Sequence, residues 1–240
     1  MSDPLAADVG AILRLFAGLG RCAPGDAASV ALATAGLAPD AVVLDAGCGR
    51  GADLPALLAA VPQGRVVAVD LAAPFVDHVR ATWCGVQAHV ADMLDPPGGP
   101  FDLIWSGGAA YGPGVAACLA AWRGALAPGG RVAFSHLCWR KDRPSEVARA
   151  FWAVEFPDMA DVAALEATIH AAGMRSVVSR WLPDAAWDNY YAPLAARIDT
   201  LAPDPDPQMQ AVLAGFRAEI AMWRENGADY GYRLTVAECR

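Results

Sequence analysis

The sequence predicts an α/β protein whose mostly parallel sheet is covered by helices on both faces. Three observations support this prediction. Short apolar runs alternate with helix-like stretches from residue 40 to residue 136, a glycine-rich turn follows the first apolar run, and two further strand patterns occur late in the chain. Because parallel neighbours need a crossover connection, this alternation of strand, helix and strand is the sequence form of such a sheet.

Five strands are expected in the first part of the chain, separated by helix-like stretches. The strands are residues 41–45, 65–70, 86–90, 101–106 and 131–136. Helices are expected from the glycine-rich turn through Val61, over 74–84 and over 115–126. The turn Ala127–Gly130 contains one proline and two glycines and opens the fifth strand.

The pattern changes after His136. A helix is expected near 162–172, a strand over 174–181 and a final strand over 230–238. Before the final strand, aromatic and apolar residues recur at helical spacing from Trp187 to Ile198 and again from Val212 to Trp223, on either side of a proline-rich linker. Residues 182–229 form a longer insertion than a connection needs, and we expect a helical cover over a substrate pocket.

Composition excludes several classes of protein. Of the 240 residues, 55% are hydrophobic and 18% are charged, which indicates a large core and rules out intrinsic disorder. The net charge is −8 and Lys141 is the only lysine, so no basic patch is expected for nucleic acid or anionic lipid. Charged residues interrupt the apolar segments, and we expect no membrane span.

The cysteines indicate a reducing compartment. They show neither the paired spacing of a zinc site nor a disulfide framework, so we expect free thiols and no metal. No basic leader precedes an apolar run at the N-terminus, and no secretory signal is expected. These features predict a soluble cytoplasmic protein. The cysteines are Cys22, Cys48, Cys84, Cys118, Cys138 and Cys239.

The strongest functional signal is the turn after the first strand, which reads Asp45-Ala-Gly47-Cys-Gly49-Arg-Gly51. Glycine permits unusual backbone dihedrals and the close approach of a ligand. The N-terminus of the helix that follows presents free N–H groups to an anion. A tight turn without a ligand is the alternative, but a strand, a carboxylate and three glycines together favour a binding site.

Two cofactor classes fit this turn. Asp70 ends the second strand 23 residues after Gly47, where its carboxylate can accept hydrogen bonds from an adenosine ribose. The turn also satisfies the loose dinucleotide pattern, with Ala52 in the last place. Asp45 favours a different cofactor, because it would repel a pyrophosphate but attract an ammonium and a sulfonium. Asp92, just past the third strand, can accept a hydrogen bond from an adenine amino group.

With these elements the chain resembles the class I, Rossmann-like S-adenosylmethionine-dependent methyltransferases, in their small-molecule branch. The family's fold implies a three-layer sandwich with a seven-stranded sheet of order 3-2-1-4-5-7-6, in which the last strand is antiparallel. A dinucleotide dehydrogenase would instead continue with another βαβ unit. Five segments carry the resemblance in the family's order and spacing: Leu44–Gly51, Val69–Leu71, Ala91–Met93, Phe101–Ser106 and Leu126–Gly130.

The resemblance implies one domain, residues 1–240. Its parts are N-terminal helices or a lid (1–39), a cofactor-binding core (40–136), the remaining sheet (137–181 and 230–240) and the helical cover (182–229).

The resemblance implies that the methionyl end of S-adenosylmethionine is lined by Asp45, Gly47, Cys48 and Gly49. The backbone oxygen of Ser106 is implied near the methionyl ammonium.

At the adenosine end, Asp70 is implied to hold the ribose and Leu71 to pack near the adenine. Asp92 and Met93 would contact the edge and face of the adenine. Arg21 belongs to a segment that resembles an N-terminal lid, where it would meet a carboxylate; an exposed arginine in a turn is the alternative.

Methyl transfer from a sulfonium is an in-line displacement, in which the protein mainly aligns the reactants and excludes water. Acid–base help is needed only when the acceptor arrives protonated. Tyr111, beyond the fourth strand, and His136, at the end of the fifth, lie where open α/β sheets bind ligands, so both are catalytic candidates. The alternatives are loop packing for Tyr111 and a backbone hydrogen bond for His136.

Trp139, Trp187, Tyr190 and Tyr191 are candidates for the walls of a substrate pocket, although the helical spacing of the last three also fits core packing. The predicted function is methyl transfer from S-adenosylmethionine to an N, O or C atom of a small metabolite. The predicted enzyme is a monomer or homodimer that binds no nucleic acid and no membrane. A catalytically silent S-adenosylmethionine-binding protein and an NAD(P)-dependent oxidoreductase remain as alternatives.

Overall fold

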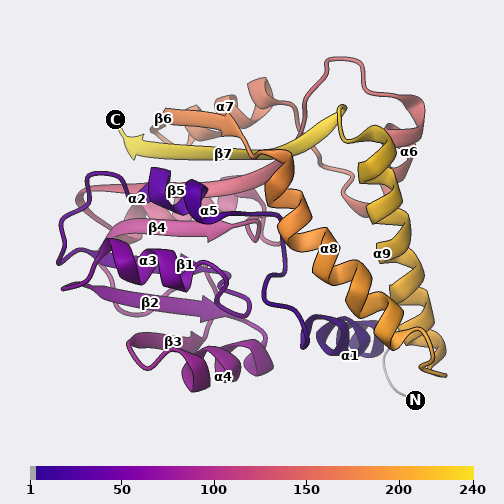
Figure 1. Ribbon diagram of the computed structural model, residues 1–240. Coiled ribbons are helices and arrows are strands. Elements are labelled where there is room, and N and C mark those ends of the chain that lie inside the picture. Colours follow the sequence, from indigo (N-terminus) through magenta and orange to yellow (C-terminus); the bar gives the residue numbers. More distant parts are fainter. Residues whose placement is uncertain (1–3) are drawn as a thin grey trace.

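The computed structural model describes residues 4–240, with side chains from Val9 onward. Within these residues seven strands form one sheet, in the order β3-β2-β1-β4-β5-β7-β6 (Figure 1). β7 runs antiparallel to both β5 and β6, whereas the other pairs are parallel. The predicted fold class and strand order are therefore confirmed.

The strands are β1 (Val42–Ala46), β2 (Arg65–Asp70), β3 (Val86–Val90), β4 (Phe101–Gly107), β5 (Leu126–Trp139), β6 (Met174–Trp181) and β7 (Tyr230–Cys239). The helices are α1 (Pro4–Phe16), α2 (Ala27–Thr34), α3 (Leu54–Ala60), α4 (Ala73–Thr82), α5 (Val115–Ala125), α6 (Glu146–Glu155), α7 (Val162–Ala171), α8 (Asp184–Leu201) and α9 (Pro207–Asn226).

The central strands are apolar on both faces because helices cover both faces. Alternate residues of a strand point to opposite sides of a sheet. Val43 of β1 and its neighbour Leu103 of β4 accordingly pack in one core with α2, α3 and α4. Leu44 and Ile104, the next pair along, pack in a second core with α5 and α7.

Two elements differ from the sequence-based expectation. β5 begins at Leu126 instead of Arg131, because Leu126 pairs with Phe101 before the register shifts at the turn that contains Gly129. α6 was not predicted, because the charged stretch before it obscured its start. The hydroxyl of Ser145 caps this helix by accepting a hydrogen bond from the N–H of Ala148 at 3.2 Å.

α1, α8 and α9 form a group of their own at the carboxyl ends of the parallel strands (Figure 1). They share a third core, in which Leu15, Leu194 and Leu213 are fully buried. Arg197 of α8 donates to the carbonyl oxygen of Arg14 at 3.2 Å, and Arg14 in turn pairs with Asp206 at 3.1 Å. These contacts fix α1 against the insertion between β6 and β7. No helix in residues 4–240 is long and apolar enough to cross a membrane.

Shortening Ile104 to alanine should lower the free energy of unfolding by about 2–5 kcal/mol, because its side chain is fully buried in the core between the sheet and helices α5 and α7, and its removal leaves a cavity. Chemical denaturation followed by circular dichroism measures the loss. The matched control is Val147→Ala on α6, which is 61% exposed and should change stability by less than about 0.5 kcal/mol. Equal effects of the two substitutions would contradict the packing described here.

Candidate active site

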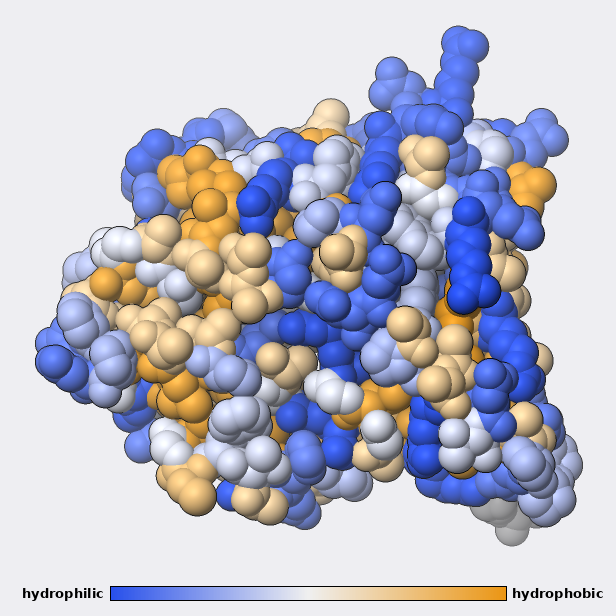
Figure 2. Space-filling view, in the orientation of Figure 1, coloured by the Kyte–Doolittle hydropathy of each residue, from blue (hydrophilic) through white to orange (hydrophobic). Residues whose placement is uncertain are grey.

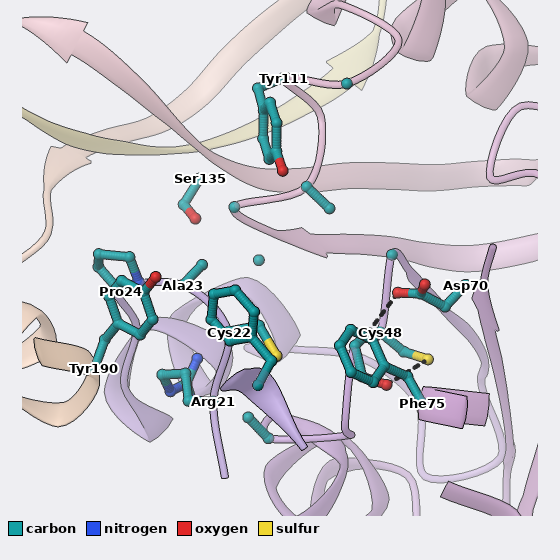
Figure 3. A pocket seen from close by; sticks show the side chains of 18 of the residues that line it. Arg21, Cys22, Ala23, Pro24, Cys48, Asp70, Phe75, Tyr111, Ser135 and Tyr190 are labelled. Atoms are coloured by element: carbon teal, nitrogen blue, oxygen red, sulfur yellow. Dashed lines mark hydrogen bonds between the residues drawn. The ribbon is translucent and has the colours of Figure 1, made fainter. Parts of the chain in front are cut away.

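A cavity of about 830 Å³ lies between the carboxyl ends of the parallel strands and the group formed by α1, α8 and α9 (Figure 3). Hydrophilic residues gather between the sheet and these helices in the middle of the face shown in Figure 2. The sheet contributes Asp45, the glycine-rich turn and Asp70, while the helices contribute mostly aromatic side chains. The cavity therefore has a polar half at the sheet and an aromatic half beneath the helices.

The glycine-rich turn shapes the polar half. Gly47 and Gly49 have φ angles of +76° and +51°, a region that side-chain-bearing residues rarely adopt. A Cβ on Gly47 would also collide with the side chain of Ala109, and it would come within 3.0 Å of the methyl group of Met93. The N–H groups of Gly47 and Cys48 both donate to the carbonyl oxygen of Val69, at 2.9 Å each.

Asp70 holds this turn to the end of β2. One carboxylate oxygen accepts a hydrogen bond from the N–H of Gly49 at 2.9 Å, and the other accepts one from the N–H of Ala72 at 2.8 Å. Each carboxylate oxygen has a second lone pair, so the group can still accept hydrogen bonds from a ligand. Asp70 lines the cavity in the position that the sequence predicts for a ribose-binding carboxylate (Figure 3).

Asp45 lines the same half of the cavity and is 3% exposed. Burial raises the pKa of its carboxyl well above the ordinary value, and the nearby carboxylates of Asp53 and Asp70 raise it further. Arg21 opposes this shift, but its guanidinium is already paired with Asp53 at 2.6 Å. Asp53 also accepts a hydrogen bond from the indole N–H of Trp105 at 2.9 Å. Asp45 thus lacks a cation of its own.

The residues predicted at the adenine side reach the cavity. Leu71 is 73% exposed and, like Asp92 and Met93, lines the cavity wall. Asp92 accepts a hydrogen bond from the N–H of Leu94 at 2.9 Å, which fixes the turn after β3. The carbonyl oxygen of Met93 accepts a hydrogen bond from the indole N–H of Trp122 at 2.8 Å, which ties this turn to α5.

Three predicted site residues do not line the cavity. Ser106 is fully buried, and its hydroxyl donates to the carbonyl oxygen of Ala46 at 2.9 Å, so it joins β4 to β1. Trp139 packs against Tyr230, with ring centroids 6.4 Å apart. Tyr191 is buried and donates to the carboxylate of Glu219 at 2.7 Å. Gly107 and Gly108 line the cavity next to Ser106 instead.

The two catalytic candidates, Tyr111 and His136, face the cavity from the loop after β4 and from β5. Tyr111 follows β4, and its hydroxyl points into the cavity, between Ser135 and Asp70 in the view of Figure 3. His136 of β5 is 6% exposed and packs edge-on against Phe156, with ring centroids 5.6 Å apart. Burial lowers the pKa of His136 to about 4, so its imidazole is neutral at physiological pH and can accept a proton.

The aromatic half contains residues that sequence reasoning predicted and others that it missed. Arg21, Trp187 and Tyr190 line the cavity as expected. Glu219 of α9 also lines it, although no motif marks this residue. Its position three residues after Phe216, on the face that turns toward α8, is the one signal that could have found it. Further lining residues that were missed are Phe16, Cys22, Phe75, Ser135, Trp152 and Tyr232.

Two free cysteines lie in this site. Among the side chains from Val9 onward, no group of His, Cys, Asp and Glu is arranged to hold a metal ion. Cys22 and Cys48 line the cavity as free thiols. Burial raises the pKa of Cys22 to about 11, so its thiol stays protonated near neutral pH.

The buried imidazole of His136 should make stability depend on pH. Its pKa of about 4 lies below the unfolded value of about 6.5, so the unfolded chain binds a proton more readily. The stabilisation is complete above pH 6.5 and falls as pH drops toward 4, by up to roughly 3 kcal/mol. Urea unfolding at several pH values should show this loss, and His136→Gln should reduce it. An unchanged pH profile in the variant would contradict the neutral, buried state.

Comparisons with known proteins agree with this geometry. Residues 43–130 match the family model of the methyltransferase domain. No protein of curated function matches the chain by sequence. A methyltransferase from Geobacter sulfurreducens, solved with S-adenosyl-L-homocysteine, superposes with a TM-score of 0.80 at 19% identity, over 96% of this chain and 98% of that one. A methyltransferase from Thiobacillus denitrificans, also solved with S-adenosyl-L-homocysteine, gives 0.79 at 20% identity over 100% of both chains.

A geranyl diphosphate C-methyltransferase from Streptomyces coelicolor superposes less closely, with a TM-score of 0.62 at 18% identity, over 89% of this chain and 76% of that one. The segment that matches the family model, residues 43–130, runs from β1 to the turn within β5. It therefore contains the glycine-rich turn, Asp70 and Asp92. Residues 43–130 thus match a methyltransferase domain, and the chain as a whole has the fold of these solved methyltransferases.

Proposed function

We propose that this methyltransferase moves a methyl group from S-adenosylmethionine to an N, O or C atom of a small molecule bound beneath α8 and α9. One observation carries the proposal. The cavity that begins at Asp70 and the glycine-rich turn continues, without a dividing wall, to Tyr190 and Glu219 of the helices. Its volume of about 830 Å³ is in the range of sites that enclose small ligands.

The residues of the polar half fit S-adenosylmethionine. When bound, this cofactor supplies a methyl group activated by a sulfonium. The carboxyl of Asp45, which has no cation beside it in the protein, attracts the methionyl ammonium when ionised, and the glycine-rich turn lets a ligand approach its backbone closely. Asp70 has free lone pairs for the ribose hydroxyls, while Leu71, Asp92 and Met93 surround the space left for the adenine.

The aromatic half fits a small acceptor. In-line displacement needs alignment and a dry environment more than it needs a particular catalytic group. The rings of Trp187 and Tyr190 supply an apolar wall, and α8 and α9 lie on this side of the cavity. Where the acceptor arrives protonated, the neutral imidazole of His136 or the hydroxyl of Tyr111 can take part in proton transfer.

The sequence also predicts the domain organisation, cellular compartment, oligomeric state and partners of this protein. We propose a single-domain protein that acts in the cytoplasm as a monomer or homodimer, with neither nucleic acid nor a membrane as partner. The free cysteines and the acidic net charge of −8 support this proposal. The antiparallel β7 stands where a dinucleotide oxidoreductase would have a further βαβ unit, which argues against that alternative.

Asp70→Ala should weaken binding of S-adenosyl-L-homocysteine about 10- to 100-fold, because the ribose loses a charged acceptor and the turn loses two hydrogen bonds. Calorimetric titration measures the affinity. The matched control, Asp77→Ala on α4, removes a carboxylate whose side chain is 69% exposed and should leave affinity unchanged. Binding of NAD by the wild-type protein, with no response to S-adenosyl-L-homocysteine, would overturn the proposal.

A screen of small metabolites with labelled S-adenosylmethionine separates an enzyme from a silent binding protein. Turnover of any acceptor, lost together with cofactor binding in Asp70→Ala, supports the enzyme. Cofactor binding without turnover of any acceptor supports the silent alternative.

Cofactor affinity should also depend on pH through Asp45. The raised pKa means that this carboxyl keeps its proton to a higher pH than an ordinary carboxyl, and only the ionised form attracts the methionyl ammonium. Affinity for S-adenosyl-L-homocysteine should therefore rise with pH above the ordinary carboxyl range, until amino groups begin to deprotonate. The rise should be much smaller in Asp45→Asn, whose side chain stays neutral. Parallel pH profiles for the two proteins would contradict this role.

A further inference from the structure

The aromatic half of the cavity is acidic as well as aromatic. α6 contributes Glu155 and α9 contributes Glu219 to its wall. Aromatic rings from α1, α8 and α9 surround the same space, and the ring of Phe16 on α1 contacts rings on both α8 and α9. Its ring is stacked with Tyr190 at 6.4 Å and meets Phe216 edge-on at 5.4 Å, measured between ring centroids. The methyl acceptor must therefore fit among aromatic faces with carboxylates at their edge.

Glu219 is positioned by a neighbour and remains available to a ligand. One of its oxygens accepts a hydrogen bond from the hydroxyl of Tyr191 at 2.7 Å. Among residues 4–240 no further group donates to its carboxylate, and the side chain faces the cavity. Burial, with a smaller contribution from Glu155, raises the pKa of Glu219 to about 7, while Tyr191 opposes the shift. The carboxylate thus lacks a cation beside it.

In the aromatic half, no described lining residue offers an unpaired basic side chain to an anionic acceptor. Arg21 is paired with Asp53 at 2.6 Å, so its charge is balanced within the protein. Arg50 belongs to the glycine-rich turn of the polar half, where it donates to the carbonyl oxygen of Leu19 at 2.7 Å and lies beside His78. His136 is neutral, because burial lowers its pKa to about 4. A phosphate or carboxylate on the acceptor would therefore lose its hydration without gaining a counter-charge.

We propose that the methyl acceptor is an amine with an apolar body, whose ammonium form binds Glu219 between the aromatic rings of α1, α8 and α9. Methyl transfer to this nitrogen would first require its proton to pass to Glu219, which frees the lone pair for attack on the sulfonium methyl group. This inference rests on the proposed function, because it assigns the aromatic half of the cavity to the acceptor. A carboxylate with one oxygen open to the cavity forms charge-assisted hydrogen bonds with an ammonium. Aromatic faces attract the same cation, and they pack against its apolar part.

Glu219 is the group that should set the pH dependence of acceptor binding. The groups that face it are Tyr190 and Tyr191 on α8, Tyr230 and Tyr232 on β7, Tyr111 after β4, and Glu155 on α6. The pKa of each tyrosine is raised, mainly by burial, so these phenols stay neutral near pH 7. His136 titrates far lower, near 4. Binding of an amine should therefore strengthen as pH rises through about 7.

The test compares compounds that share one body and differ in charge. Tryptamine, tryptophol and indole-3-acetate form an indole series, and isoamylamine, isoamyl alcohol and isovalerate form a smaller aliphatic series. Each is titrated calorimetrically into the full-length protein with and without saturating S-adenosyl-L-homocysteine. In at least one series the amine should bind about 10- to 100-fold more tightly than the alcohol, and the acid should bind least.

Glu219→Gln should abolish this preference and the rise in amine affinity near pH 7, while leaving affinity for S-adenosyl-L-homocysteine unchanged. Tyr191→Phe keeps the carboxylate and should retain most of the preference. The matched control is Glu225→Gln on the same helix, which changes an exposed glutamate outside the cavity and should behave like the wild-type protein.

The outcomes separate this inference from the proposed function. A protein that binds S-adenosyl-L-homocysteine but prefers no amine in either series overturns the inference and leaves the proposed function standing. A preference that survives in Glu219→Gln also overturns it. An amine preference that requires Glu219, in a protein that does not bind S-adenosyl-L-homocysteine, supports the amine site and contradicts the proposed function.

Discussion

The site depends on one carboxylate that receives two backbone hydrogen bonds. The N–H groups of Gly49 and Ala72 donate to the two oxygens of Asp70, at 2.9 Å and 2.8 Å. Hydrogen bonds to a charged group contribute about 1.5–3 kcal/mol each, more than neutral ones. They hold the turn after β1 against the tip of β2, which sets the floor of the cavity. Asp45, Cys48 and Met93 line the cavity around that floor.

Charge is distributed unevenly between the cavity and its ligands. Asp45, Asp70, Asp92, Glu155 and Glu219 line the cavity, whereas Arg21 is paired with Asp53 and Arg50 hydrogen-bonds the carbonyl oxygen of Leu19. Buried carboxylates lose hydration, and without a cation beside them their protonated forms are favoured. This explains why Asp45 in the polar half and Glu219 in the aromatic half both have raised pKa values. A positively charged group on a ligand would offset this cost of desolvation, both at Asp45 and at Glu219.

The sequence predicted the sheet well because its signals are local. Apolar runs mark the strands, and the glycine-rich turn and Asp70 lie within one strand–turn–helix unit, so their proximity could be inferred. The aromatic half was harder, because its geometry depends on how α8 packs on α9. Helical spacing placed Tyr190 and Tyr191 on neighbouring positions, but it could not show that Tyr190 lines the cavity while Tyr191 holds Glu219.

Ser106 and Trp139 illustrate the same limit at strand ends. Both lie near the carboxyl end of a strand, where ligands bind in such sheets. A small change in the orientation of such a side chain decides whether it contacts the ligand or packs against other residues of the protein. The hydroxyl of Ser106 turns back to the carbonyl oxygen of Ala46, and the ring of Trp139 turns to Tyr230. A single sequence carries no signal for these directions.

The helical insertion leaves and rejoins the sheet at adjacent points. Trp181, just before it, pairs with Arg233, and the N–H of Leu182 donates to the carbonyl oxygen of Tyr232 at 2.9 Å. Because these contacts hold the two ends of the insertion together, lengthening or replacing it adds little to the entropic cost of closing the loop. The helices that form the aromatic half of the cavity can thus be exchanged, in evolution or by engineering, while the strands and turns that form the polar half keep their register.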